Sequence, residues 1–119
     1  MAVKYSNNAS TTINGAITAA ATSITVNDVS EFPTLTGSDY TYLTLSTLDA
    51  TTIEVIKVTA INTSTKVLTV IRGQDDTTGA IFSSGDICEL RLNAAMLNDA
   101  ASQNDDASGT AVAMSIALG

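Results

Sequence analysis

The sequence predicts a small all-β protein, an antiparallel β-sandwich or barrel with a short C-terminal helix and an extended C-terminal strand. Three observations predict this class. Thr and Ser make up 31 of the 119 residues, and the β-branched Thr suits a pleated sheet. Several short segments alternate apolar and polar residues with a period of two. The length fits a single domain with its own core.

Four regions follow from the changes in composition along the chain. Residues 1–12 are mostly polar and predict an N-terminal arm. The β domain is expected over residues 13–102 and ends in the short helix. Residues 103–110 carry no large apolar side chain and predict a linker to a final strand over residues 111–119.

The strands of the β domain are expected where the apolar and polar residues alternate most clearly. A four-residue turn at 62–65 joins two of these segments into a β-hairpin. Apolar residues occur on both faces of that hairpin, which predicts cover on both sides, and another subunit could supply one side. The expected strands cover residues 23–27, 40–48, 53–61, 66–72 and 87–92.

The short helix is expected to begin after Asn93, a residue that favours the N-cap position, and to cover residues 94–102. Its apolar residues at i, i+4 spacing allow two buried faces. One face would present Leu97 with Ala101, and the alternative face would present Met96 with Ala100.

The last eight residues before Gly119 alternate large and small side chains, which is typical of a strand. The linker before them could span about 25 Å when extended. The strand could close the sheet of its own chain, or it could add to a sheet edge of a neighbouring molecule. Its large side chains are therefore candidate interface residues: Val112, Met114, Ile116 and Leu118.

Composition excludes several function classes. The chain has no His, so it lacks a His general base, a Ser-His-Asp triad and a His zinc ligand. One Cys allows no internal disulfide. Five basic against twelve acidic residues give a net charge of −7, without the basic footprint that nucleic acid needs. We therefore expect no catalytic residues, cofactor, metal or nucleic-acid partner. No run of 18 apolar residues and no apolar signal-peptide core occurs, so we also expect no membrane partner and folding in a cytoplasm.

Two tyrosines form the other candidate interface. Tyr40 and Tyr42 share one face of a predicted strand, and Leu43 and Leu45 share the opposite face. If the leucine face is buried in the core, the tyrosine pair points outward and is available to a partner. The alternative is ordinary cross-strand packing.

The long connection over residues 73–85 contains Asp75 and Asp76, with Asp86 just beyond it. Carboxylates are ligands for Ca²⁺, but their spacing here does not match an EF-hand. A solvated acidic loop is therefore the expected role.

The remaining charged and thiol side chains have simple expected roles. Glu54 with Lys57, and Glu89 with Arg91, are candidate surface ion pairs. Cys88 lies in an alternating segment and is expected to be a small buried apolar residue.

Two segments carry a resemblance to a known family. Residues 54–60 (EVIKVTA) and 68–78 (LTVIRGQDDTT) are followed by Gly85 and a strand, and Phe32 and Pro33 lie upstream. This arrangement resembles a β-rich domain of tailed-phage virion proteins, with its patterns E-x-x-K-V-T, L-T-V-x-R-G-Q-x-G-T-T-A and F-P. The resemblance covers roughly residues 13–98.

The chain departs from that family pattern at three positions. Asp76 stands where the family usually has Gly, Gly79 stands where Ala is usual, and Phe82 falls where His or Trp is common. These differences predict a changed conformation of the loop over residues 73–85 and do not alter the rest of the resemblance.

The resemblance implies a non-catalytic, self-assembling structural role in a virion, as a homo-oligomer and often a trimer. The implied partners are other virion proteins, major capsid or tail proteins. Because the chain has no distal fibre region, we expect a capsid decoration (cement) protein that clamps neighbouring subunits. The alternatives are a tail-fibre or tail accessory protein and a glycan-binding adhesin module that uses Tyr40 and Tyr42. The protein would fold in the host cytoplasm and then reside in the virion.

Overall fold

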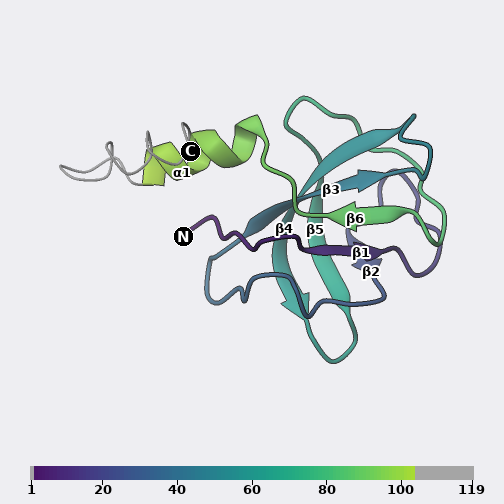
Figure 1. Cartoon of the computed structure of the whole chain (residues 1–119), viewed down its shortest axis with the longest axis horizontal. Coiled ribbons are helices and arrows are strands. Elements are labelled where there is room, and N and C mark those ends of the chain that lie inside the picture. Colours follow the sequence, from purple (N-terminus) through teal and green to yellow (C-terminus); the bar gives the residue numbers. More distant parts are fainter. Residues whose placement is uncertain (1, 104–119) are drawn as a thin grey trace.

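The computed structural model describes residues 2–103 as one curled antiparallel sheet with a short helix beside it (Figure 1). The predicted all-β class with a short C-terminal helix is confirmed. The predicted strand over residues 111–119 lies outside the described residues. The elements are β1 (Ser10–Thr12), β2 (Ser23–Thr25), β3 (Thr41–Ser46), β4 (Ile53–Asn62), β5 (Val67–Gln74), β6 (Ile87–Glu89) and α1 (Ala94–Gln103).

The sheet is a half-barrel. Its strands lie in the order β1-β6-β3-β4-β5-β2, and each neighbouring pair is antiparallel. The two outermost strands meet at an isolated bridge between Ile13 and Val26, where Asn14 N–H donates to Thr25 O at 2.8 Å. The sheet therefore curls back on itself, and the barrel alternative describes it better than the sandwich.

The main core fills the inside of this curl. Successive side chains of a strand point to opposite faces, so one face of each strand supplies the core. Burying these branched apolar side chains is the dominant favourable contribution to folding. The central members come in alternating pairs, Leu43 and Leu45 on β3, Ile56 and Val58 on β4, and Leu68 and Val70 on β5.

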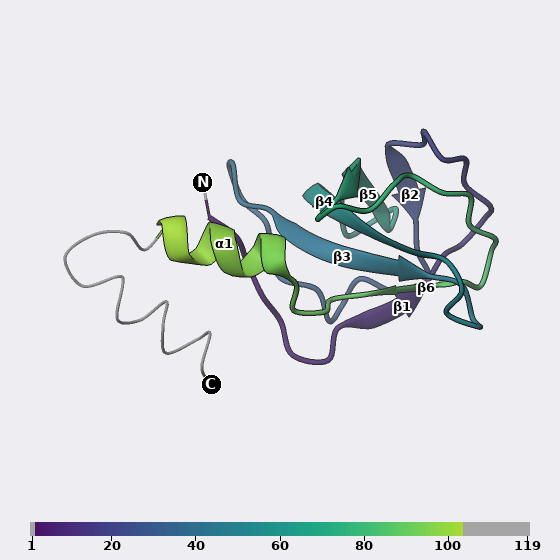
Figure 2. The same ribbon diagram turned by 90° about the horizontal axis from the view of Figure 1, so that it is seen from above.

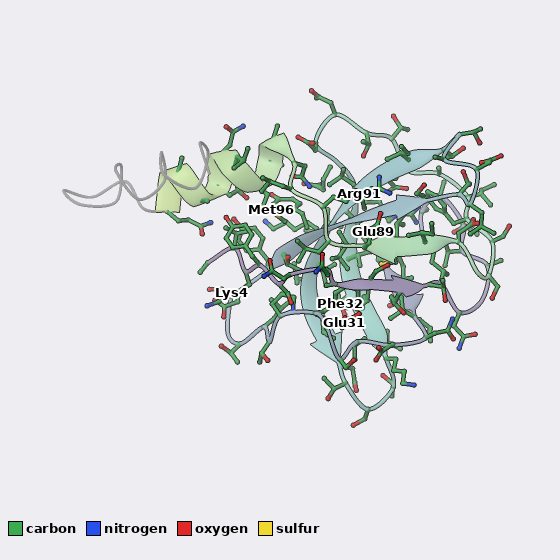
Figure 3. The ribbon with its side chains drawn as sticks, viewed as in Figure 1. Lys4, Glu31, Phe32, Glu89, Arg91 and Met96 are labelled. Carbon is green, nitrogen blue, oxygen red and sulfur yellow. The ribbon has the colours of Figure 1, made fainter. Side chains whose placement is uncertain are left out.

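Helix α1 covers part of the outer face. Asn93 Oδ1 accepts a hydrogen bond from Met96 N–H at 2.9 Å, so the predicted N-cap is confirmed. Of the two possible helix faces, the one with Met96 and Ala100 is buried (Figure 3). Figure 2 shows α1 alongside the beginning of β3. No helix within residues 2–103 is long and apolar enough to cross a membrane.

The N-terminal segment differs from the predicted arm over residues 1–12. Val3 is buried and bridges Tyr40, while residues 10–12 form β1 beside β6. The polar composition hid this placement, because the segment is held mainly by backbone pairing to the sheet. Val3 N–H also donates to Gln103 Oε1 at 2.8 Å, so both ends of the described chain lie at one end of the molecule (Figure 1).

The predicted hairpin between β4 and β5 is confirmed. Lys66 N–H donates to Asn62 O at 2.8 Å and closes the turn. The Asn62 side chain accepts hydrogen bonds from the backbone N–H groups of Ser64 and Thr65, both at 3.0 Å. This side-chain capping is the reason that Asn is favoured at such turns.

Candidate functional site

The residues that carry the family resemblance build a buried ion pair. Glu54 on β4 is fully buried, and Arg72 on β5 reaches it across the inner face of the hairpin. Arg72 Nε lies 2.7 Å from Glu54 Oε2, and Arg72 Nη2 lies 2.7 Å from Glu54 Oε1. This two-pronged geometry is the strong form of the Arg–carboxylate interaction.

Backbone donors complete the environment of the buried carboxylate. Gly73 N–H donates to Glu54 Oε2 and Ala80 N–H donates to Glu54 Oε1, each at 2.9 Å. The carboxylate thus accepts four hydrogen bonds, which offset the cost of removing its charge from water.

The guanidinium of Arg72 joins two further segments to the pair. It donates to Thr18 O at 2.7 Å, to Ala21 O at 3.1 Å and to Ala80 O at 2.6 Å. Within residues 2–103, no buried side-chain nitrogen or oxygen lacks a hydrogen-bond partner. We call this group the Glu54–Arg72 clip, because it ties residues 18–21 and the loop after β5 to the hairpin.

The loop after β5 is held in a defined shape. Gly73, Asp75 and Asp76 have positive φ angles of 62°, 53° and 61°. Thr77 Oγ1 accepts a hydrogen bond from Val55 N–H at 2.9 Å and so ties the loop to β4. Asp76, which stands where the resembling family usually has Gly, takes the left-handed conformation that glycine adopts at little cost.

Gly79 permits a close approach between two backbone segments. A Cβ atom at this position would lie 2.5 Å from Ala19 O, well inside van der Waals contact. An alanine here, as is usual in the resembling family, would require residues 18–21 to lie further from the loop. The backbone at Ala19 therefore lies close enough to fit Gly79 but too close for the alanine of the family pattern.

The acidic residues near this loop serve the fold. Asp75 Oδ1 accepts a hydrogen bond from Ala95 N–H at 3.0 Å, at the beginning of α1. Asp86 Oδ2 accepts one from Ser83 N–H at 2.8 Å. Over the described part of the chain, no cluster of three or more His, Cys, Asp or Glu side chains could hold a metal ion.

A second polar cluster lies between the sheet and α1. The hydroxyl groups of Tyr40 and Tyr42 both donate to Asp99 Oδ2 at 2.7 Å. Their rings meet edge to face with centroids 5.8 Å apart, and Lys57 Nζ lies 4.2 Å from the centre of the Tyr40 ring. Gln103 Nε2 donates to the Tyr40 hydroxyl at 2.5 Å. We call these residues the tyrosine cluster.

The prediction that the tyrosine pair points outward to a partner is corrected by this cluster. Tyr40 and Tyr42 do lie opposite the core face of β3, but they are only 3% and 5% exposed. Helix α1 of the same chain covers them, and strand alternation gives no sign of that cover. Burial, followed by the hydrogen bond to Asp99, raises the pKa of Tyr40 to about 12 and raises the pKa of Tyr42 as well.

Cys88 is a buried residue of the main core, as predicted. Burial, with a smaller contribution from the neighbouring Glu89, raises the pKa of its thiol to about 12. The thiolate needed for nucleophilic chemistry is therefore strongly disfavoured in the folded protein.

Of the two predicted surface ion pairs, one is present. Arg91 and Glu89 are bonded at the protein surface (Figure 3). The pairing of Glu54 with Lys57 is wrong, because residues three apart on a strand point to opposite faces. Alternation could have identified Arg72 as the true partner, since it follows Leu68 and Val70 on the inward face of β5.

Asp99 was not identified from the sequence as a functional residue. The sequence feature that could have identified it is its position three residues after Met96 and one before Ala100, which places it beside the buried helix face. A carboxylate on that face needs polar partners from the sheet, and the tyrosines supply them.

A groove opens between residues 28–35 and the tip of the β4–β5 hairpin. Its volume is about 360 Å³. Four of its ten lining residues lie in the main core or pack against it, so the groove borders the core of the half-barrel. Its lining includes the apolar Val29, Phe32, Leu35 and Ile61 and the charged Asp28 and Lys66.

The other predicted interface residues lie outside the described residues, and their role stays a prediction: Val112, Met114, Ile116 and Leu118. Comparison with models of known protein families and with characterised proteins gives no match to this chain.

Proposed function

We propose that this chain is a non-catalytic structural protein of a bacteriophage virion, acting as a capsid decoration (cement) protein that clamps neighbouring subunits. The partners are other virion proteins, and the protein assembles as a homo-oligomer, with a trimer as the arrangement suggested by the family resemblance. The alternative within the same class is a tail-fibre or tail accessory protein.

The Glu54–Arg72 clip is the observation that carries this proposal. It joins Glu54 of the first resembling segment to Arg72 and Gly73 of the second, and its polar atoms are used in bonds within the fold. A motif that performs chemistry leaves a reactive group facing a substrate, whereas this one joins three backbone segments. Its residues therefore support a role in maintaining shape.

The placement of the chain ends also supports a clamp. Val3 is bonded to Gln103, so the two ends of the described chain lie together on one side of the domain. The apolar alternation over residues 111–118 then provides a means of gripping a neighbour through strand addition.

A glycan-binding role finds less support. That alternative relied on Tyr40 and Tyr42 as exposed stacking surfaces, and α1 covers both. A glycan array remains a useful control for the structural role. Specific binding at micromolar strength would favour the adhesin over the cement protein.

The experiment uses particles of the phage that encodes this chain, prepared with and without its gene. The purified full-length protein is added back to the lacking particles, and retention after gradient sedimentation is measured on separated heads and tails. A cement protein returns to heads in a fixed ratio to the major capsid protein. Binding to tails alone would select the tail accessory alternative, and no binding to either would refute the proposal.

Two variants of the C-terminal segment test the clamp within this experiment. Ile116→Asp puts a charge on the large apolar side of the alternating segment, and Ser115→Asp puts the same charge on the small side. We expect Ile116→Asp to lower retention at least about tenfold, because a buried unpaired charge is costly. Ser115→Asp is the matched control and should bind as the original chain does.

A further inference from the structure

One edge of β4 lacks a neighbouring strand near the hairpin tip. The last pair between β3 and β4 is Thr41 with Val58, and β4 continues to Asn62. Over its final residues β4 pairs with β5 alone in the described part of the chain. Unpaired strand edges are common sites of strand addition.

The groove lies beside this free edge and is apolar at its base. A register shift between Val58 and Ala60 interrupts the regular alternation of β4, and Ile61 packs against the main core. Phe32 and Leu35 face it from the loop before β3. An extended segment that paired with β4 here could place alternate side chains into the groove.

The groove rim carries one charge of each sign. Lys4, Arg72 and Arg91 are in ion pairs, and Lys57 lies over a tyrosine ring. Lys66 lines the groove together with Asp28, and hydrogen bonds from Ser30, with a smaller contribution from the charge of Lys66, hold the pKa of Asp28 below its usual value. These two opposite charges offset each other, so the apolar side chains are the distinctive feature of the groove.

The chain itself contains a segment with these properties. Residues 111–118 present a large apolar side chain at every second position, and Asp105 and Asp106 precede them in the linker. The other alternating segments that we identified in the sequence are already in the sheet. The segment thus offers the alternating apolar side chains that suit the apolar groove.

A neighbouring copy can supply this segment more directly than the chain itself. Gln103, the last described residue, is held by Tyr40 in the cluster on the outer face. The groove belongs to the main core on the inner side of the sheet. Gln103 and the groove thus lie on different sides of the sheet, and a second copy can approach the groove from outside.

We propose that the groove formed by Phe32, Leu35 and Ile61 binds residues 111–118 of a second copy of this chain. The bound segment extends the free edge of β4, and its large side chains fill the groove. A segment that docks in this way on the next subunit gives a closed ring or a reciprocal dimer. This inference rests on the proposed function, because it names the site through which the clamp grips.

The test is chemical cross-linking between two full-length variants of different mass. One carries Ile61→Cys and the other carries Ile116→Cys, and a short bis-maleimide joins cysteines that lie close together. Cys88 is buried and does not compete. The expected product is a covalent pair that contains one chain of each kind. Leu48→Cys, 74% exposed in the loop at the far end of β3, replaces Ile61→Cys as the control and should give no such pair.

Two results would overturn this inference. The first uses a single chain that carries both Ile61→Cys and Ile116→Cys. If this chain cross-links only within itself at high dilution, the segment binds in the groove of its own chain. The absence of any product with Ile61→Cys, while circular dichroism shows the sheet intact, would mean that the groove does not bind the segment.

Light scattering provides the second measurement. The original chain should have a mass of at least twice 12.2 kDa, and Ile116→Asp should weaken association at least about tenfold. Ser115→Asp should leave the mass unchanged. If the protein is monomeric but still binds phage heads, this inference and the homo-oligomer part of the proposed function fail, and the cement role stands. If it forms the cross-linked oligomer but binds no particle, this inference stands and the proposed function fails.

Discussion

Arg72 and Glu54 form a two-pronged ion pair inside the half-barrel, with 8% and 0% of their side chains exposed. A surface ion pair contributes little, because water competes for both charges. Here the charges have exchanged water for each other and for five backbone groups. Loss of one partner would leave the other charge buried without compensation.

We expect Glu54→Gln to lower the free energy of unfolding by about 3–5 kcal/mol, the range seen when one partner of a buried ion pair is removed. Urea unfolding followed by circular dichroism measures this change. Glu89→Gln is the matched control, because its partner Arg91 is 44% exposed in its side chain, and its cost should stay below about 1 kcal/mol. Equal costs for the two variants would contradict the role given to the clip.

An apolar replacement of both partners should fail to restore stability. In many proteins a buried ion pair can be replaced by apolar residues at no cost. Here Gly73 and Ala80 each donate a backbone N–H to Glu54, and these donors would lose their partner. A double variant with Leu at 54 and 72 should therefore unfold at lower urea than the original chain, and full recovery would argue against this account.

Gly79→Ala tests the close approach to residues 18–21. Its new methyl group would lie 2.5 Å from Ala19 O, so the backbone must shift, at a cost of about 1–3 kcal/mol. Gly37→Ala is a useful comparison, because its φ of +60° brings conformational strain but its surroundings are open. Thermal unfolding should show the larger loss for Gly79→Ala.

The tyrosine cluster predicts sensitivity to alkali. The pKa of Tyr40 is raised from 10.0 to about 12, so the folded state favours the neutral phenol. Its contribution to stability is complete below pH 10.0, and it is lost as the pH rises from 10.0 toward about 12. Thermal unfolding as a function of pH should show a decline over this window.

The variant Tyr40→Phe with Tyr42→Phe separates this effect from general denaturation by base. It removes both phenols while keeping the rings, so the decline between pH 10.0 and about 12 should become shallower. A decline as steep as that of the original chain would show that the cluster does not cause it.

Helix α1 is expected to depend on one apolar anchor. Met96 is fully buried beneath the helix, and its replacement by Ala should cost about 2–5 kcal/mol of helix docking. Hydrogen exchange over residues 94–103 measures this loss locally. Asn98→Ala, on the exposed side of the same helix, should leave exchange nearly unchanged. Equal protection in the two variants would mean that Met96 is not the anchor.

Local patterns were sufficient to predict most of the sheet. Period-two alternation located β3, β4 and β5 within about two residues, because one face of each is buried. The Asn62 turn and the Asn93 cap were predictable because they depend on short-range hydrogen bonds. The order of the strands in the sheet was not predictable, because β1 and β2 are short and their places depend on distant partners.

The candidate site was harder to predict than the fold, because it depends on contacts between segments far apart in the sequence. Glu54 and Arg72 stand 18 residues apart, and Tyr40 and Asp99 stand 59 apart. Alternation indicated that Tyr40 faces away from the core, but whether α1 covers it depends on the path of the chain after β6. The N-terminal segment shows the same limit, since backbone pairing leaves little trace in composition.

The measurement that tests the central claim most directly is a density map of the phage particle that contains this chain. The account predicts that the half-barrel formed by residues 2–103 fits density on the head, with β-strand contacts between it and neighbouring subunits. A map in which the protein occupies neither the head nor the tail, although the particle preparation comes from cells that make it, would contradict the account.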